Sequence, residues 1–164
     1  SSEMEPTGGF IQPSTIWLAM SQVRSTELDG EEIESLLGTG GVGVISFADG
    51  DEPYSIPVSY GYDSNAGSLY VRFGFAPNSE KRAFIDDGVT ASLVVMAEAI
   101  DGWQSVVARG PLREVTEMAI DSHAAESVRK INIPFVTIYD RRASELEFEL
   151  YRLEPDSITG RCER

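Results

Sequence analysis

Cysteine, histidine and lysine are nearly absent from this chain of 164 residues. The only cysteine is Cys162, the only histidine is His123, and the only lysines are Lys81 and Lys130. A single cysteine excludes a disulfide within the chain and is typical of a protein in a reducing cytoplasm, which is the location we expect. No Ser-His-Asp or Cys-His nucleophile arrangement can be assembled from these residues.

Long apolar runs and a basic surface are missing as well. No stretch approaches the roughly 20 apolar residues that a membrane-spanning helix needs, and the N-terminus lacks the basic start of a signal peptide. The chain carries 13 basic and 27 acidic side chains, for a formal net charge of −14. Because such a surface repels polyanions, we expect no nucleic-acid partner and no association with a membrane.

The acidity and the shortage of lysine together are typical of proteins that stay soluble at very high salt. Salt screens the self-repulsion of a highly charged chain, so such a chain tolerates its charge best in brine. The composition therefore predicts a halophilic source. An ordinary acidic cytoplasmic protein is the alternative.

Enough apolar material remains for one folded domain. Hydrophobic residues make up 41% of the chain and aromatic residues 9%, which argues against disorder. Residues 1–25 are rich in Ser, Thr, Pro and Gly and show no sustained period, so they are interpreted as an N-terminal arm or extension. Residues 26–164 then form a single domain.

Hydrophobic periodicity predicts a small antiparallel barrel with inserted helices. Asp29, followed by Glu32, forms a capping box at the start of the first helix, and Asp49-Gly50 is a hairpin signal. Pro57 cannot donate to a ladder, so it marks an edge, a bulge or a place where the strand faces a ligand. Strands are predicted at residues 42–48, 53–62, 68–73, 89–97, 103–112 and 145–153, and helices at 30–37, 79–87 and 116–130.

Basic side chains gather near the predicted helix start at Ser79. They are Arg72, Lys81, Arg82 and Arg109. A basic site in so acidic a chain favours a bound phosphate, which first-turn backbone amides, a Ser hydroxyl and one or two cations can hold together. The alternative is an N-cap Ser followed by solvated charges.

Several short motifs follow one another in residues 28–112. They are Leu-Leu-Gly at 36–38, Pro-Tyr-Ser-Ile-Pro-Val-Ser-Tyr at 53–60, Gly-Ser-Leu-Tyr-Val-Arg at 67–72, Ser-Glu-Lys-Arg at 79–82 and Trp-Gln-Ser-Val-Val-x-x-Gly at 103–110. In these motifs the chain resembles the FMN-binding split-barrel family related to pyridoxamine 5′-phosphate oxidase. The resemblance implies a mainly β fold with inserted helices, an antiparallel split β-barrel of the FMN-binding type. It also implies a homodimer with FMN at the subunit interface.

The resemblance further implies which residues bind the FMN cofactor. Ser79 and Lys81 match the Ser-x-Lys that holds the FMN phosphate, with Arg82 as a helper. Trp103 and Ser105 match the segment that closes over the phosphate or ribityl end, usually from the other subunit. The strands that run beside the isoalloxazine ring and the ribityl chain match Ile56, Pro57, Val58, Tyr70, Val71 and Arg72.

The chain also departs from the pattern of true pyridoxamine phosphate oxidases. Those enzymes carry an Arg-x-His near the C-terminus and a Tyr on the preceding helix for the phosphate of the substrate. Here the chain ends Arg-Cys-Glu-Arg at 161–164, and residues 123–130 contain no Tyr. Vitamin B6 oxidation is therefore not expected, and the closer likeness is to short members such as the nitroimidazole-resistance type.

We predict an FMN-dependent oxidoreductase that transfers hydride between the flavin and a small-molecule substrate or electron donor. A flavin-binding protein without turnover (a carrier, sensor or sink) and a haem- or deazaflavin-binding relative on the same barrel are the alternatives. His123 is a candidate acid, base or haem ligand, or else a surface or interface residue. The row Glu145, Glu147 and Glu149 is interpreted as the solvated side of a strand, so no metal site is predicted.

Overall fold

The computed structural model describes residues 25–38, 40–100, 102–116, 121–129, 131 and 146–163. Residues 1–24 of the predicted N-terminal arm lie outside the described residues. The strands are β1 (Ser25–Glu27), β2 (Gly41–Asp49), β3 (Glu52–Asp63), β4 (Ser68–Phe75), β5 (Thr90–Ala99), β6 (Gly102–Glu114), β7 (Glu147–Leu153) and β8 (Ser157–Glu163). The helices are α2 (Gly30–Leu37), α3 (Lys81–Phe84) and α4 (Ser122–Arg129).

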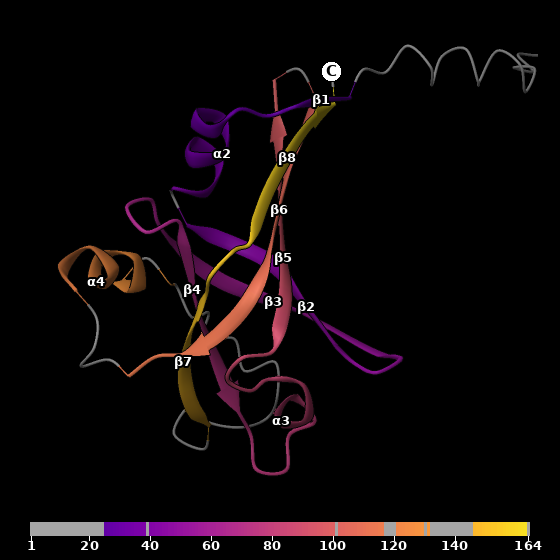
Figure 1. Ribbon diagram of the computed structural model, residues 1–164, viewed down its shortest axis with the longest axis vertical. Coiled ribbons are helices and arrows are strands. Elements are labelled where there is room, and N and C mark those ends of the chain that lie inside the picture. The colour runs from indigo at the N-terminus through magenta and orange to yellow at the C-terminus, as the bar shows by residue number, and fades with distance from the viewer. Residues whose placement is uncertain are drawn as a thin grey trace, which may run out of the picture.

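The strands form one antiparallel sheet that closes into a barrel. Their order is β1-β8-β6-β5-β2-β3-β4-β7, and a further pairing of β6 with β7 closes the sheet. Along one edge of β6, residues 112–114 pair with β7 and residues 103–109 pair with β8. Because β8 pairs with the part of β6 that β7 leaves, β8 and β1 lie beyond the closed part of the barrel, at the end where the C-terminus is marked (Figure 1). This architecture confirms the predicted antiparallel split β-barrel.

Gly110 lies where β6 changes partner from β7 to β8. A Cβ at this position would meet the backbone carbonyl of Glu154, in the connection between the two strands. The N–H of Asp156 donates to the Arg109 carbonyl at 2.8 Å, which holds that connection close to β6. A side chain at position 110 would push the connection away, so the last position of the Trp-Gln-Ser-Val-Val-x-x-Gly motif needs glycine for its packing.

The six predicted strands are all present within a few residues of their expected limits, whereas β1 and β8 are not predicted by the sequence pattern. β1 is only three residues long. β8 contains Gly160, which weakens a strand pattern. A Cβ at Gly160 would lie 2.9 Å from the side chain of Leu28, so the glycine is needed for the close approach of the segment before α2. The formation of β8 therefore depends on tertiary contacts that the sequence pattern does not show.

The first helix starts and ends as predicted. Asp29 Oδ1 accepts the backbone N–H of Glu32 at 2.8 Å, and the helix ends before Gly38. α3 is shorter than predicted: it is a single turn rather than a helix over residues 79–87. The reason is Ile85, which adopts an extended conformation (φ −104°) and is buried in the core at 3% exposure. Core burial outweighs continuation of the helix.

The predicted start of the last helix at Thr116 is wrong. Thr116 is not helical, and the residue before it is held to β7, where the N–H of Val115 donates to the Leu150 carbonyl at 2.9 Å. α4 instead starts after Asp121, whose carboxylate accepts the N–H of Ala124 at 2.7 Å and so serves as the helix cap. Residues 117–120 and 130 of the predicted helix lie outside the described residues.

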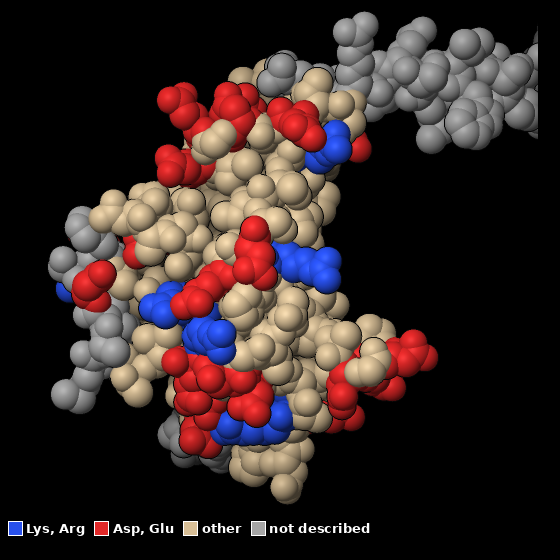
Figure 2. Space-filling model, in the orientation of Figure 1, with Lys and Arg blue, Asp and Glu red and all other residues tan. Residues whose placement is uncertain are grey.

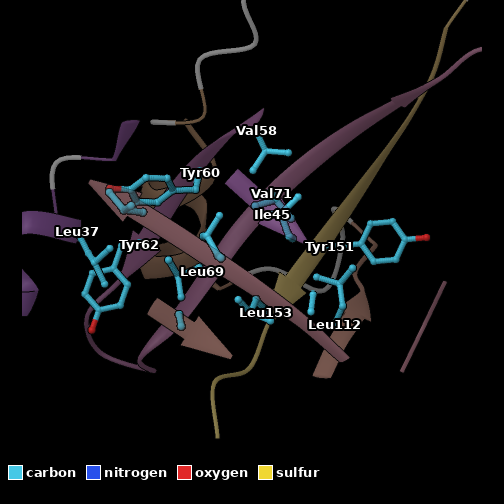
Figure 3. Close-up of a cluster of buried hydrophobic side chains, with 14 of the residues drawn as sticks. Leu37, Ile45, Val58, Tyr60, Tyr62, Leu69, Val71, Leu112, Tyr151 and Leu153 are labelled. Atoms are coloured by element: carbon cyan, nitrogen blue, oxygen red, sulfur yellow. The ribbon is translucent and has the colours of Figure 1, made fainter. Parts of the chain in front are cut away.

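The main core fills the barrel with the inward-facing residues of its strands. Figure 3 shows Leu37 and Tyr62 at one end of this cluster and Tyr151 at the other. The ring of Phe73 meets that of Tyr151 edge-on, with centroids 5.5 Å apart. The largest fully buried side chains are Tyr60, Tyr151, Phe73, Phe75, Leu37, Ile45, Leu69, Leu93, Leu112, Leu153, Val71 and Val106.

A second, smaller apolar cluster lies where α4 packs on the outer side of β3 and β4. Gly61 allows this packing, because a Cβ there would meet the backbone carbonyl of Ser127. The Ser127 hydroxyl donates to the Tyr62 carbonyl at 2.9 Å and ties the helix to β3. The buried residues of this cluster are Tyr70, Ala124, Ile131 and Leu150.

Acidic side chains gather at separate places on the surface (Figure 2). One group covers α2 and includes residues 29–34, and another occupies the tip of the β2–β3 hairpin at residues 49–52. Elsewhere on this face, basic and acidic side chains lie next to one another. Within the described part of the chain, no helix is long and apolar enough to cross a membrane.

Candidate functional site

β3 and β4 pair at one end and then separate, and we call the region between their separated segments the fork. Tyr60 opposite Val71 is the last pair before they part. Among the described strands, residues 52–59 of β3 pair only with β2, and residues 72–75 of β4 pair only with β7. No described strand therefore covers these edges, and the position of Pro57 in this segment confirms its predicted place at an edge.

α3 contacts both arms of the fork. On the β3 side, the Phe84 ring stacks on that of Tyr54, with centroids 4.8 Å apart and 10° between their planes. On the β4 side, Lys81 Nζ donates to the Gly74 carbonyl at 3.0 Å. The Ser-Glu-Lys-Arg motif, which begins at Ser79, is thereby held where the two strands have parted.

Lys81 forms no ion pair with a described carboxylate, although the chain has 27 acidic side chains. The hydrogen bond to Gly74 is the only one of its Nζ within the described residues. An ammonium has three N–H donors, so two remain for a ligand. Burial lowers the pKa of Lys81 from its ordinary value, because desolvation disfavours the charged form. An anion beside this ammonium would offset that cost.

The backbone N–H groups of α3 provide fewer free hydrogen-bond donors for an anion than the Lys81 side chain does. The N–H groups of Ser79, Arg82 and Ala83 already donate to carbonyls within the loop and the turn. The N–H of Lys81 donates to Ser79 Oγ at 3.3 Å. These four N–H groups are therefore already used within the chain, and the positive charge comes from the Lys81 side chain.

Arg82, the next residue, is held by acidic partners. Its Nη1 donates to Glu149 Oε1 and its Nη2 to Glu147 Oε2, both at 2.8 Å. Its guanidinium carbon lies 4.0 Å from the centre of the Phe75 ring. The hydrogen bond that Arg82 donates to Glu149 raises the pKa of Arg82, so the group stays protonated. The predicted helper of the phosphate therefore already has two anionic partners.

Glu149 was interpreted from the sequence as part of a solvated row, and its role in the site was missed. Its side chain is only 17% exposed, and besides Arg82 it accepts the hydroxyl of the buried Tyr151 at 2.9 Å. Burial first, and the Glu149 hydrogen bond second, raise the pKa of Tyr151 well above its ordinary range. No local signal could reveal the contact with Arg82, because the two residues are 67 positions apart.

Of the residues predicted beside the ring, Ile56, Pro57, Val58 and Arg72 lie on the arms of the fork, whereas Tyr70 and Val71 lie in the part of β4 that still pairs with β3. Val58 and Val71 point into the main core, and Ile56 packs against it. Tyr70 points the other way, into the cluster under α4. Arg72, whose side chain is half-buried, is the first residue of β4 beyond the last pair with β3.

Trp103 and Ser105 are not brought to the fork within one chain. Both lie on β6, which is separated from β3 by β5 and β2 in the sheet. They share the outer face of the sheet, where Trp103 is 50% exposed. Pro57 points to the same face, opposite Val44. The structure thus divides the predicted site residues into a fork group and an outer-face group.

The outer face of the sheet carries exposed apolar residues on several strands. Trp103, Met96 and Val42 are 50%, 62% and 64% exposed. One row of directly opposite residues crosses the face from strand to strand and consists of Pro57, Val44, Val94, Val107 and finally the polar Thr159.

Residues with metal-binding or nucleophilic side chains do not gather elsewhere in the part of the chain that the structure describes. No three His, Cys, Asp or Glu residues come together there as metal ligands. Cys162 is buried in β8 at 1% exposure. His123 belongs to α4, and its side chain lies outside the described part, so its predicted alternatives stay untested.

Solved structures share this fold at low sequence identity. An FAD-binding protein from Mesorhizobium loti matches at 20% identity and a TM-score of 0.62, over 87% of this chain and 98% of that one. The FAD-binding protein from Mycobacterium smegmatis matches at 19% identity and 0.58, over 85% and 99%. An FAD- and haem-binding protein from M. smegmatis matches at 13% identity and 0.58, over 85% and 73%. No curated protein matches the sequence.

The family model described as pyridoxamine 5′-phosphate oxidase matches residues 29–162. The match begins at Asp29, the cap of α2, and ends at Cys162 in β8, so it includes the whole barrel and the fork. It covers far more than half of the chain. Together with the split barrel found in the structure, this match shows that the chain belongs to the pyridoxamine 5′-phosphate oxidase family.

Proposed function

We propose that the chain binds FMN at the fork, with the phosphate of the flavin on Lys81. The observation that carries this proposal is a partly buried ammonium that pairs with none of the described carboxylates of an acidic chain. A phosphate dianion supplies the missing negative charge through charge-assisted hydrogen bonds. The Ser79 hydroxyl, two residues away, can donate a further hydrogen bond.

The two arms of the fork suit the flat part of a flavin. Residues 52–59 and 72–75 leave strand edges that no described strand covers. Such edges offer backbone donors and acceptors to the polar rim of a ring, and apolar residues such as Ile56 offer contacts to its body. The FAD-binding proteins that share this fold support a flavin. The single lysine at the fork favours the single phosphate of FMN.

The proposed activity is that of an oxidoreductase acting on a small molecule. A bound flavin would supply hydride transfer, so the protein needs no nucleophile of its own. The chain would contribute the anchor at Lys81, the orientation set by the β3 and β4 backbones, and apolar walls that exclude water. Pyridoxamine phosphate oxidation is not proposed, because the chain lacks the residues for the second phosphate.

We also propose that the active form is a homodimer joined through the outer face of the sheet. The apolar row through Val44 and Val94 needs a cover, and a second copy provides an equally apolar one. Trp103 and Ser105, which lie on that face, would then reach the fork of the partner. This arrangement would complete a site that one chain leaves divided.

Lys81→Ala tests the phosphate contact. Loss of a charge-assisted hydrogen bond of about 1.5–3 kcal/mol should weaken FMN binding roughly ten- to a hundredfold. Riboflavin, which lacks the phosphate, should bind the variant and the wild type alike. The dissociation constants of both flavins, and of FAD, are measured by quenching of flavin fluorescence.

Lys130→Ala is the matched control, since it removes the only other lysine, and it should change neither affinity. Equal losses of FMN and riboflavin affinity in Lys81→Ala would contradict the phosphate contact. Anaerobic addition of NADH or NADPH to the loaded protein then separates an enzyme, whose flavin absorbance bleaches, from a protein that only binds flavin.

A further inference from the structure

We infer that Arg82 is a positioning residue for Lys81 and does not bind the flavin phosphate itself. The inference rests on the proposed flavin site and concerns how its phosphate anchor is held. Two neighbouring cations differ in their partners. Lys81 pairs with no described carboxylate, whereas Arg82 pairs with both Glu147 and Glu149.

The guanidinium of Arg82 is held on three sides. Glu147 and Glu149 occupy its two terminal nitrogens, and the ring of Phe75 lies against its face. Phe75 and Glu147 are directly opposite each other on β4 and β7. The three partners therefore form one preformed socket on paired strands. Tyr151 fixes the socket further by donating to Glu149 at 2.9 Å.

α3 depends on such outside contacts for its position. It is a single turn, and its N-cap, Glu80, makes no side-chain capping hydrogen bond. One isolated turn is not stable in water, because helix nucleation costs more than one turn returns. Its described anchors are the Phe84–Tyr54 stack, the Lys81–Gly74 hydrogen bond and the Arg82 socket. Loss of the socket would let Lys81 shift away from the fork.

The charges around Arg82 also argue against a phosphate there. A phosphate that approached the guanidinium would meet two carboxylates and be repelled by them. Displacing them would leave Glu149 partly buried with one partner fewer. Arg82 and its two carboxylates together carry a net negative charge, so this group does not attract an anion.

The test compares Arg82→Gln with the double variant Glu147→Gln/Glu149→Gln. The first removes the guanidinium from the socket and the second removes the charges that hold it, so both should weaken FMN binding, on the order of fivefold, and leave riboflavin binding unchanged. In a Lys81→Ala background, Arg82→Gln should have no further effect on FMN, because Arg82 acts through Lys81. Circular dichroism confirms that each variant is folded.

A phosphate-binding Arg82 would give the opposite result in the double variant. Removal of two carboxylates would release the guanidinium and tighten FMN binding, which would overturn the inference. Three other results would also overturn it. The first is a loss of FMN affinity in Arg82→Gln that is equally large in the Lys81→Ala background, and the second is unchanged FMN binding in Arg82→Gln. The third is full FMN affinity in Arg82→Lys, whose ammonium cannot fill the socket. Failure of the proposed function is distinct, since wild type would then bind FMN no more tightly than riboflavin.

Discussion

β2, β5 and β6 carry apolar residues on both faces, but among the described residues those of the inner face are buried far more completely. Ile45 and Leu93 are opposite each other on the inner face, at 0% and 1% exposure. Their neighbours Val44 and Val94 form the corresponding pair on the outer face, where Val44 is 44% exposed. An alternating strand normally places polar residues on its solvated side. The exposed apolar residues of the outer face are therefore the ones that the proposed dimer would cover.

The comparison separates what stabilises the fold from what completes the site. Inner residues contribute free energy of folding, because a single chain removes them from water. Outer residues can contribute only when a second surface covers them. Trp103 belongs to this outer set, so its proposed contact with a flavin depends on association rather than on folding. The predictions below separate the stability of the fold from the association of two chains.

The largest effect is expected for Leu93→Ala on the inner face. Removing this buried side chain should lower the free energy of unfolding by about 2–5 kcal/mol, through lost burial and the cavity left behind. Val94→Ala, one position along on the outer face, should cost about 1 kcal/mol or less. Denaturant titration at high salt measures both. Equal losses would mean that the two faces are equally covered in the folded chain.

Val44→Glu tests the outer face and should act on association. A charge in the middle of the apolar row should weaken the proposed dimer at least roughly tenfold while leaving the fold intact. Ala48→Glu is the control, because it adds the same charge to the same face of the same strand, near the hairpin tip. Sedimentation velocity at micromolar concentration reports the change. A wild-type monomer with FMN bound would contradict the dimer.

Alkaline pH should destabilise the folded protein, because tyrosines buried on the inner face would lose their protons. Burial raises the pKa values of Tyr60, Tyr62 and Tyr151 above the ordinary 10.0. The folded state therefore holds these protons more tightly than the unfolded state, so the stability they contribute is complete below pH 10 and is lost as the pH rises toward the folded pKa values. In Tyr60→Phe the loss should be smaller. Tyrosinate absorbance and circular dichroism follow both; an identical pH profile would rule out a contribution from Tyr60.

Salt should have the smallest effect, and it should favour both the folded chain and the proposed dimer. Between 0.1 and 1 M the screening length falls from about 10 Å to ~3 Å, which reduces repulsion within a chain of net charge −14 and between its copies. A gain of about 1 kcal/mol would raise the melting temperature by roughly 3 °C for a chain of this size. A flat or falling melting temperature over this range would contradict the halophilic interpretation.

Much of the fold could be predicted, because its signals are local. Asp29 caps its helix through a contact three residues away, and Asp49-Gly50 turns its hairpin with Gly50 at a φ of 58°. The alternation of apolar and polar residues predicts which residues of six strands face the core. β8 could not be predicted, since its glycine is explained only by the packing of Leu28 from a distant part of the chain.

The sequence alone determined the barrel class, the acidic surface and the position of Lys81 as the one lysine near the predicted phosphate site. Those properties depend on composition and on neighbours within a few residues. Only the tertiary structure decided that Arg82 is held by Glu147 and Glu149 and that Trp103 lies on a strand separated from β3 by two others. Strand order and register bring together residues far apart in the sequence. No local pattern records which partner a charged or aromatic side chain will meet.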